Sequence, residues 1–393
     1  MPDAFVSPLA PCTHRPTCPG CPRYGEGGIA PASLALLREI AGAHRAALDD
    51  VVEGAASAFR VRARLAVRGR PASPKMGIFQ EGTHRIADIP SCVVHHPRIN
   101  EAAAAVRRAI RRCGIAPYAE GPHRGLLRYV QVVVERGSGR VQITLVANDD
   151  APASLCAMAD ELVTDLGALV HGIWWNGNTE RTNVIFGPRW HHVHGREAVC
   201  ERIGGADVFF PPGAFGQSNL DVADRIVADV HALVPDGEVV GELYAGCGSF
   251  GLGLLQRSVQ VRFNESSEHG LLGLRMGLNA LEPGVAARAA IFGGDAGEQA
   301  RMIDGARVVI VDPPRKGLHA DVVDALSAAR PALLLYVSCD LASLARDAQA
   351  LQSRAGLHLR RLRPYALFPY TAHVETLAVF AGDAARDDVA RER

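Results

Sequence analysis

The chain has 393 residues, 48% hydrophobic and 21% charged, proportions that are typical of a folded protein with more than one packed unit and exclude a largely disordered one. No stretch reaches the roughly 20 uninterrupted apolar residues of a membrane helix, and no basic segment followed by an apolar one opens the chain, so we expect a cytoplasmic protein without a membrane partner. Lys plus Arg and Asp plus Glu balance at 42 each, which argues against a protein that coats nucleic acid non-specifically.

The first residues form a loop that is rich in cysteine. In "CTHRPTCPGCPRYGEGG" Pro and Gly surround Cys12, Cys18 and Cys21, so neither a helix nor a strand is expected. Cys92 follows in "DIPSCVVHHP", and the odd total of nine cysteines without an export signal argues against a disulfide framework. Three close thiols and one distant thiol could hold zinc or an iron–sulfur cluster, and the spacing alone does not decide between them.

Positive charge is concentrated in this first part of the chain. Residues 1–112 carry 16 Arg and Lys against 9 Asp and Glu, and nearly all of the positive residues are Arg. Such a surplus would suit a polyanion, because Arg makes bidentate phosphate contacts. Biased codon usage would explain the preference for Arg equally well, so both explanations stay open.

The pattern up to about residue 215 predicts a mixed α+β region. Helical spacing of apolar residues occurs in three segments: 32–48, 101–113 and 153–169. Strand-like segments lie between them: "FRVRARLAV", "YVQVVVE", "VQITLVA", "GIWWNGN" and "NVIFGP". The pair "YVQVVVE" and "VQITLVA" is joined by "RGSGR", which indicates a turn.

From about residue 216 helices and apolar strands alternate. Helices are expected over 219–233, 249–257, 267–281, 319–329 and 341–353. Strands are expected in "EVVGELYA", "VQVRFNE", "ARAAIFGGD", "ARVVIVD", "ALLLYVS", "LHLRRLRPYAL" and "HVETLAVFA". This alternation predicts a mostly parallel, doubly wound sheet, in which ligands bind beyond the carboxyl ends of the strands.

Polar residues end four of these strands in series. "ELYAGCGSFGLGLL" combines a strand, a Gly-rich turn and a helix, and its Gly246 and Gly248 would let the backbone approach a ligand closely. A single Asp at a strand end is usually a helix cap. The series of Tyr244, Glu265, Asp295 and Asp312 instead favours a cofactor pocket, with Glu265 spaced to hold a ribose diol.

A cysteine, Cys339, ends the next strand in "LYVSCDLASLARD". A lone Cys is usually a small buried hydrophobic residue. Here it stands at the edge where the cofactor is expected, and a helix starts directly after it, so we expect its thiolate to be favoured. We interpret Cys339 as a nucleophile.

Five ordered motifs carry a resemblance to a known family. "AFGQSN", "ELYAGCGSFGL", "DPPRKG", "SCDLASLARD" and "HVETLAVF" resemble the signature of S-adenosylmethionine-dependent uracil-C5 RNA methyltransferases. The similarity continues upstream and is greatest to the short, iron–sulfur-containing 23S rRNA enzymes. It implies a Rossmann-like class I methyltransferase domain with a mostly parallel seven-stranded sheet, preceded by an α+β RNA-binding region with an iron–sulfur loop and no amino-terminal β-barrel. The implied division is 1–100 for the iron–sulfur region, 101–215 for the central RNA-binding region, 216–383 for the methyltransferase domain and 384–393 for a flexible tail.

The resemblance also implies roles for individual residues. Cys339 would add to C6 of the uracil ring, and Glu375 would be the general base. The expected contacts to S-adenosylmethionine come from Gln217, Tyr244, Ser249, Glu265, Asp295 and Asp312. The expected ligands of a structural four-iron four-sulfur cluster are Cys12, Cys18, Cys21 and Cys92. Arg315 would contact the RNA or take part in a structural ion pair, and these two possibilities stay open.

The implied partner is RNA, and the expected protein is a monomer. The cysteines favour 23S rRNA over the alternative, a tRNA T-loop, and the target uridine is expected to be unpaired or flipped. Alternatives of other classes are a catalytically inactive RNA-binding ribosome-assembly protein and an amino-group methyltransferase. Three positions depart from the family's usual pattern: Glu242 in the first strand motif, Phe263 before the acidic residue, and Asp340 after the cysteine.

Overall fold

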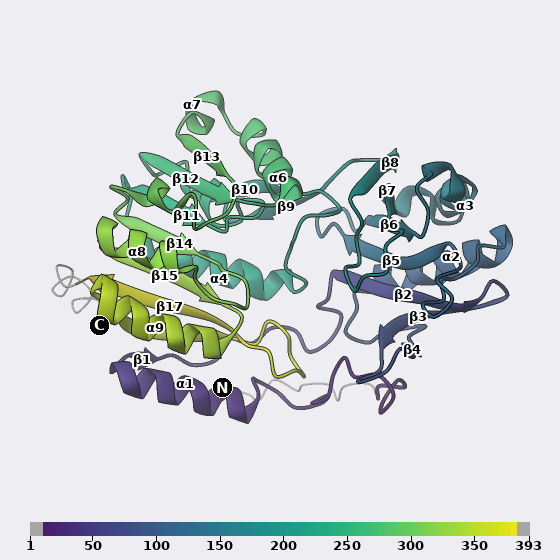
Figure 1. Cartoon of the computed structure of the whole chain (residues 1–393), viewed down its shortest axis with the longest axis horizontal. Coiled ribbons are helices and arrows are strands. Elements are labelled where there is room, and N and C mark those ends of the chain that lie inside the picture. The colour runs from purple at the N-terminus through teal and green to yellow at the C-terminus, as the bar shows by residue number, and fades with distance from the viewer. Residues whose placement is uncertain (1–10, 383–393) are drawn as a thin grey trace, which may run out of the picture. The chain divides into compact units, whose positions relative to one another are not determined.

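The computed structural model describes residues 11–382, which divide into two compact units (Figure 1). The first unit comprises residues up to Gly27, Ala55–Val199 and Gln217–Leu220, and the second comprises Gly28–Gly54, Cys200–Gly216 and the chain from Asp221 onward. These units are discontinuous in sequence, unlike the three consecutive regions expected from it. The predicted tail, 384–393, lies outside the described residues.

The first unit is built on a seven-stranded sheet with the order β4-β3-β2-β5-β6-β7-β8. The strands are β2 (Arg62–Arg70), β3 (Ser73–Phe79), β4 (Ile86–Asp88), β5 (Leu127–Val134), β6 (Val141–Ala147), β7 (Val170–Gly177) and β8 (Arg189–Gly195). Neighbouring strands are antiparallel except β6 and β7, which run parallel. Helices α2 (Pro97–Cys113) and α3 (Cys156–Leu166) cover one face and bury alternate residues of the strands beneath them, which confirms the mixed α+β prediction.

The predicted strand "NVIFGP" is wrong, because this segment is a loop before β8. Two Asn side chains take up its backbone hydrogen bonds. Asn178 donates through Nδ2 to the carbonyls of Val184 (2.8 Å) and Ile185 (3.0 Å). Asn176 donates to the carbonyl of Gly187 and accepts from its amide, both at 2.9 Å. Because these backbone carbonyls and this amide already have side-chain partners, they are not available to form a hydrogen-bond ladder with a neighbouring strand.

The second unit contains an eight-stranded sheet with the order β1-β16-β17-β15-β14-β11-β12-β13. Its strands are β1 (Ala47–Leu48), β11 (Val239–Leu243), β12 (Gln260–Glu265), β13 (Ala289–Gly293), β14 (Val308–Val311), β15 (Leu333–Ser338), β16 (Leu357–Tyr365) and β17 (Glu375–Gly382). Five adjacent strands of this sheet are parallel to one another: β13, β12, β11, β14 and β15. Strand β17 is antiparallel to both of its neighbours, β15 and β16. The expected seven strands are therefore present, and the two-residue β1 adds an eighth at the edge.

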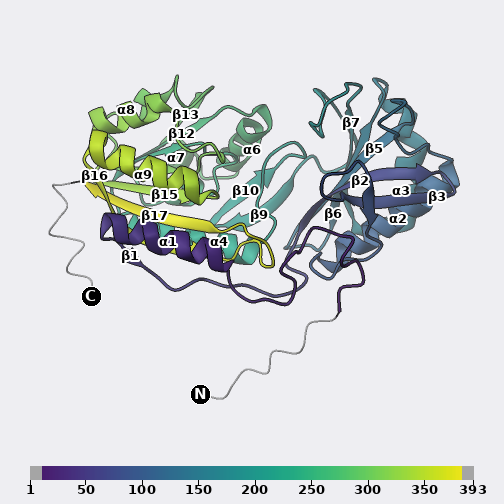
Figure 2. The ribbon, with the colours of Figure 1, turned by 60° about the horizontal axis from the view of Figure 1, so that its bottom comes forward.

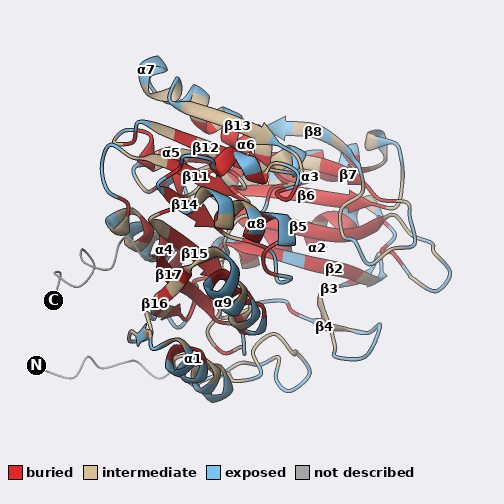
Figure 3. Cartoon of the chain, turned by 60° about the vertical axis from the view of Figure 1, so that its left-hand side comes forward, coloured by how far each residue is buried: buried red, intermediate tan, exposed pale blue. Residues whose placement is uncertain are grey.

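Helices cover both faces of this sheet. One apolar core joins it to α1 (Pro31–His44), α8 (Ala320–Ala329) and α9 (Leu341–Ala355), which Figure 2 shows along strands β15, β16 and β17. The core on the other face includes α4 (Leu220–Leu233), α5 (Gly251–Leu254) and α6 (Glu268–Asn279). The hairpin of β9 (Val199–Ile203) and β10 (Ala206–Phe210) packs against α6. The central strands are buried on both sides (Figure 3), as their continuous apolar sequences predict.

None of the helices within residues 11–382 is both long enough and apolar enough to cross a lipid bilayer.

Candidate active site at the carboxyl edge of the second sheet

The carboxyl ends of the parallel strands gather the predicted site residues at one edge. Chain order along the sheet reverses between β11 and β14, and ligands in such sheets bind in the crevice at this reversal. The residues at or directly beyond the ends of β11 to β15 are Tyr244, Glu265, Asp295, Asp312 and Cys339. Glu375 lies at the same edge because it begins the antiparallel strand β17. The pairing of Ser338 with Thr376, continued by one residue, sets Cys339 opposite Glu375.

The glycine-rich turn after β11 is held by Glu265. One carboxylate oxygen of Glu265 accepts the amide of Gly246 at 2.7 Å, and the other accepts the amide of Ser267 at 2.6 Å. Gly248 has φ +83°, and a Cβ there would lie 2.7 Å from a methyl of Leu274, so only glycine fits. A carboxylate has about four acceptor positions, so Glu265 keeps capacity for further donors such as ribose hydroxyls.

Tyr244 and Asp295 flank this turn. Tyr244 has a left-handed backbone (φ +61°), and its hydroxyl accepts the amide of His319 at 3.4 Å. Burial and then the negative charge of Asp295 raise the pKa of Tyr244. Asp295 is exposed and accepts the amide of Gly297 at 2.8 Å, so it has a local turn-forming role and still faces solvent. Ser249 lies half-buried within the turn.

Glu242 and Phe263, two of the departures from the family pattern, meet beneath the turn. Glu242 is 1% exposed, and Phe263 is fully buried. A Cβ at Gly251 would lie 2.2 Å from Oε2 of Glu242 and 2.4 Å from the Phe263 ring, so the first helical turn after the loop sits directly on both side chains. Burial raises the pKa of Glu242 to about 8. Phe263 therefore supports the turn from behind.

The expectation that the thiolate of Cys339 is favoured is wrong. Burial, and then the charges of Glu375 and Asp312, raise the pKa of the Cys339 thiol to about 11, and Arg315 offsets this only in part. The backbone amide of Cys339 also favours the thiolate, but it does not offset burial and the two carboxyl groups. The helix that follows is capped by Asp340, whose carboxylate accepts the amide of Ser343 at 2.8 Å. The free protein therefore holds Cys339 as a half-buried neutral thiol.

Two neighbouring carboxyl groups act on Cys339. Glu375 is 3% exposed, and burial, followed by the charge of Asp312, raises its pKa well above the ordinary value. Burial also raises the pKa of Asp312. The positive charge of Arg315 acts on both Glu375 and Cys339, and within residues 11–382 Arg315 forms no ion pair. Its Nη2 lies 3.5 Å from Nε2 of His373. Such an arrangement can accept and return protons beside a nucleophile.

Asp347 is a positioning residue that the sequence interpretation missed. It is 3% exposed, and its Oδ2 accepts the amide of Leu318 at 2.8 Å and the hydroxyl of Tyr336 at 2.9 Å. These bonds fix the loop after Asp312 to α9, the helix that follows Cys339. The signal was available, because Asp347 falls in the apolar stripe of α9 between Leu344 and Leu351, where a charged residue is unusual.

Gln217 belongs to the short segment Gln217–Leu220 of the first unit, so it is not placed with the six residues at this edge. It is half-buried there. Its predicted contact with a cofactor remains a prediction.

The four predicted cluster cysteines are near one another in the first unit. Burial and then Cys92, Cys18 and Cys12 raise the pKa of Cys21 to about 11, so the four thiols interact electrostatically. Asn100 fixes the backbone of Cys92 by bonds to its amide and its carbonyl, both at 3.0 Å. Sulfur donors suit zinc or iron–sulfur clusters. However, in the described part of the chain no three Cys, His, Asp or Glu side chains converge as a set of metal ligands.

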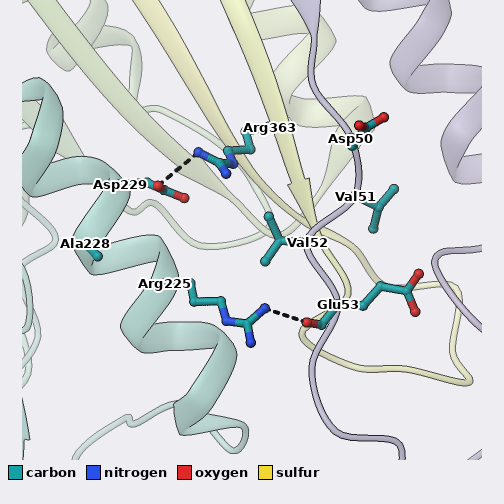
Figure 4. A pocket seen from close by; sticks show the side chains of 8 residues that line it. All are labelled: Asp50, Val51, Val52, Glu53, Arg225, Ala228, Asp229 and Arg363. Atoms are coloured by element: carbon teal, nitrogen blue, oxygen red, sulfur yellow. Dashed lines mark hydrogen bonds and ion pairs between the residues drawn. The ribbon is translucent and has the colours of Figure 1, made fainter. Parts of the chain in front are cut away.

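A separate hollow of about 440 Å³ lies between α4, β16 and residues 50–53 (Figure 4). Both of its arginines have partners within the lining. Arg363 contacts Asp229 at 2.9 Å, and Arg225 donates to the carbonyl of Glu53 at 2.7 Å. None of the predicted site residues lines it.

Comparison with known proteins adds independent evidence. Residues 305–381 match the family model described as tRNA (Uracil-5-)-methyltransferase, a range that includes Asp312, Arg315, Cys339 and Glu375. An uncharacterized RNA methyltransferase of Protochlamydia amoebophila is 34% identical over 376 residues, which cover 94% of this chain and 97% of that protein. An uncharacterized RNA methyltransferase of Geobacter sulfurreducens is 31% identical over 84% of this chain and 67% of its own length.

The fold also matches a solved structure. The tRNA (uracil-54, C5)-methyltransferase of Pyrococcus abyssi, solved with S-adenosyl-L-homocysteine, superposes with a TM-score of 0.74. The match covers 93% of this chain and 86% of that chain at 23% identity. The likeness extends over both units and shows a class I methyltransferase-like fold.

Proposed function

The chain belongs to the RNA uracil-C5 methyltransferase family, and we propose that it transfers a methyl group from S-adenosylmethionine to C5 of a uridine in RNA. The observation that carries this proposal is the meeting of Cys339, Glu375 and Asp312 at the sheet edge beside the glycine-rich turn. A nucleophilic thiol and a buried carboxyl group side by side suit a reaction that needs covalent and acid–base catalysis together.

The thiol supplies the covalent step. C5 of uracil is a poor nucleophile, so the sulfur of Cys339 first gives up its proton and bonds to C6. The electron pair of the C5–C6 double bond then forms an enolate, and C5 bonds to the methyl carbon as that carbon leaves the sulfonium sulfur. Glu375 removes the remaining C5 proton, the double bond re-forms, and the bond between C6 and the Cys339 sulfur breaks. Each turnover regenerates the thiol.

The charges around Cys339 suit both proton transfers. The thiol is neutral before RNA binds because burial and two carboxyl groups raise its pKa. Its proton therefore has to move to a neighbouring group as the uracil arrives. The raised pKa of Glu375 makes it a strong base once ionised. We assign Arg315 the role of stabilising the negative charge on sulfur and on the enolate, since its positive charge acts on both Cys339 and Glu375.

The sheet edge fits the cofactor that supplies the electrophilic methyl group. We propose that Glu265 holds the ribose hydroxyls and that Tyr244, Ser249, Asp295, Asp312 and Gln217 form the remaining contacts. The free acceptor capacity of Glu265 and the close backbone approach at Gly246 and Gly248 support this assignment. The Pyrococcus abyssi neighbour holds S-adenosyl-L-homocysteine, the demethylated product of the same cofactor.

For the substrate we propose 23S rRNA, with an unpaired or flipped uridine as the target. The support is the resemblance of Cys12, Cys18, Cys21 and Cys92 to the cluster cysteines of the short 23S rRNA enzymes, together with the electrostatic interaction of these four thiols. We propose that they hold a four-iron four-sulfur cluster that fixes the first loop. A tRNA T-loop is the second candidate, favoured by the description of the matching family model.

A covalent trap tests the mechanism. RNA substituted with 5-fluorouracil has no C5 proton to lose, so incubation with S-adenosylmethionine should give a protein–RNA adduct that survives denaturing electrophoresis. Cys339→Ala should abolish the adduct, and Cys156→Ala, which removes an exposed thiol, should leave it unchanged. On ordinary RNA, Glu375→Gln should accumulate the adduct because the C5 proton stays in place. An adduct that persists in Cys339→Ala would refute the assigned nucleophile.

Two further measurements test the substrate and the cluster. Mass mapping of 23S rRNA and tRNA from a strain lacking the gene should reveal one missing 5-methyluridine in 23S rRNA, whereas a loss in the tRNA T-loop would select the second candidate. Anaerobic purification should give a brown protein with about four irons. Stoichiometric zinc would overturn the cluster assignment.

A further inference from the structure

A row of polar and aromatic side chains crosses five strands of the first unit's sheet. Successive register pairs join Arg64 of β2 to Gln131 of β5, Gln131 to Thr144 of β6, Thr144 to Trp174 of β7, and Trp174 to His192 of β8. The alternate residues of these strands pack under α2 and α3. Since side chains alternate along a strand, this row lies on the face without helices.

The rings along this row contact one another. The guanidinium of Arg64 lies 4.9 Å from the ring centre of Phe186, and Phe186 lies 4.9 Å from Trp190. Trp190 is 6.5 Å from Trp174, which is 4.9 Å from His192. We call this set, Arg64, Trp174, Phe186, Trp190 and His192, the aromatic–arginine platform. Arg64 is exposed and the four rings are half-buried, so each keeps surface for another partner.

Hydrogen bonds hold the platform in place. Arg64 donates through Nε to Oε1 of Gln131 at 2.8 Å, and Trp174 donates through Nε1 to the carbonyl of Glu197 at 3.1 Å. The loop that carries Phe186 is fixed by Asn176 and Asn178 on both sides of that residue. A surface ordered in this way loses little further conformational entropy when a ligand binds.

Charge separates the two units. The first unit has 21 Lys and Arg against 14 Asp and Glu, a net of +7. The second has 21 against 28, a net of −7, so the chain is neutral only as a whole. A polyanion is therefore attracted to the unit that carries the platform and repelled by the other.

We propose that the aromatic–arginine platform binds unpaired bases of the RNA substrate by stacking them on Trp190, Trp174 and Phe186, with Arg64 contacting the strand. The identity of the RNA rests on the proposed function, but the binding mode does not. Aromatic faces recognise every base, and a positive environment attracts the backbone, which is the combination that single-stranded nucleic acids require. Aromatic residues and Arg are also common at protein interfaces, and the net charge of +7 on this unit is what favours RNA over a protein partner.

Binding without the methyl donor tests this proposal separately from catalysis. The probe is a dye-labelled single-stranded RNA of about 12 nucleotides, within the range of one single-strand binding site, and the same strand paired with its complement. Trp190→Ala should weaken binding of the single strand by about tenfold or more, and Trp190→Phe, which keeps a ring, should restore most of it. His192→Ala should weaken binding, whereas His191→Ala should not, because His191 pairs with Trp175 on the helix-covered face.

The outcomes separate the platform from the proposed function. Cys339→Ala should bind the probe as the unaltered protein does, and thermal unfolding should show that Trp190→Ala remains folded. Unchanged affinity in Trp190→Ala, equal losses in the two histidine variants, or a preference for the duplex would each overturn the platform. Intact platform-dependent binding by a protein that methylates no RNA would instead overturn the proposed function and leave the platform standing.

Discussion

The acidity of Cys339 can be measured directly through its reaction with iodoacetamide, which consumes only the thiolate. Burial and two carboxyl groups raise the pKa of this thiol from 9.0 to about 11. At pH 8 about one molecule in a thousand then carries the thiolate, against about one in ten for an unshifted thiol, a roughly hundredfold difference. The rate at Cys339, followed by peptide mass spectrometry of the cofactor-free protein, should rise about tenfold per pH unit from pH 7 to 10 without a plateau. Exposed Cys156 serves as the reference in the same digest.

Two substitutions assign the cause of this shift. Glu375→Gln removes the second largest contribution and should move the Cys339 profile to lower pH, because less negative charge opposes the thiolate. Arg315→Ala should move the profile to higher pH, and Arg315→Lys, which keeps the charge, should move it less. A plateau below pH 9 in the unaltered protein would refute the reasoning, since it would place the thiolate within the ordinary range despite burial.

Three other predictions concern the supports of the site. Asp347→Ala should lower the free energy of unfolding by about 3 kcal/mol, measured by urea denaturation, because the Leu318 amide and the Tyr336 hydroxyl lose their buried acceptor; an unchanged midpoint would contradict this role. Gly251→Ala should cost about 3 kcal/mol or more, because its Cβ would overlap Glu242, while Gly284→Ala, with open space around it, should cost little; equal effects would count against the packing argument. Glu242→Gln should change how stability depends on pH. The pKa of the Glu242 carboxyl is about 8 in the folded protein against 4.5 in the unfolded chain, so the native state binds more protons between these values. The free energy of unfolding of the unaltered protein therefore falls as the pH rises from about 4.5 to 8. Thermal melts across this range should show a growing advantage of the Gln variant, and parallel curves would be the contrary result.

The sequence predicted the elements best where both faces of a strand are buried. "VQITLVA" coincides with β6, and the helix expected over 341–353 is α9 at Leu341–Ala355. The helix expected over 249–257 is reduced to Gly251–Leu254, and its start is delayed by the glycine-rich turn, in which Gly246 and Gly248 have positive φ angles. "NVIFGP" has the composition of a strand, but two side chains from outside the segment take its hydrogen bonds. Local patterns do not contain that information.

The location of the site could be predicted more completely than its chemistry. The carboxyl ends of parallel strands share an edge, so Tyr244, Glu265, Asp295 and Asp312 were expected to meet. The protonation of Cys339 depends on burial and on Glu375, which arrives from a strand 36 residues later in an antiparallel pairing. The aromatic–arginine platform was equally out of reach, because it depends on the register of five strands, and a slip of one residue would turn each side chain to the opposite face.

The pairing of β1 with β16 joins segments that are far apart in the sequence, since Ala47 lies beside Arg361 and the amide of Asp49 donates to the carbonyl of Leu362. A ribosome adds about 5–20 residues per second, so α1 and β1 wait on the order of 15–60 seconds before their partner strand emerges. Most of the basic unit, Ala55–Val199, is complete long before then and has its own sheet and core. The unit that carries the proposed RNA platform can therefore fold before β16 is made, whereas the sheet that carries Cys339 is completed only after β16 and β17 have emerged.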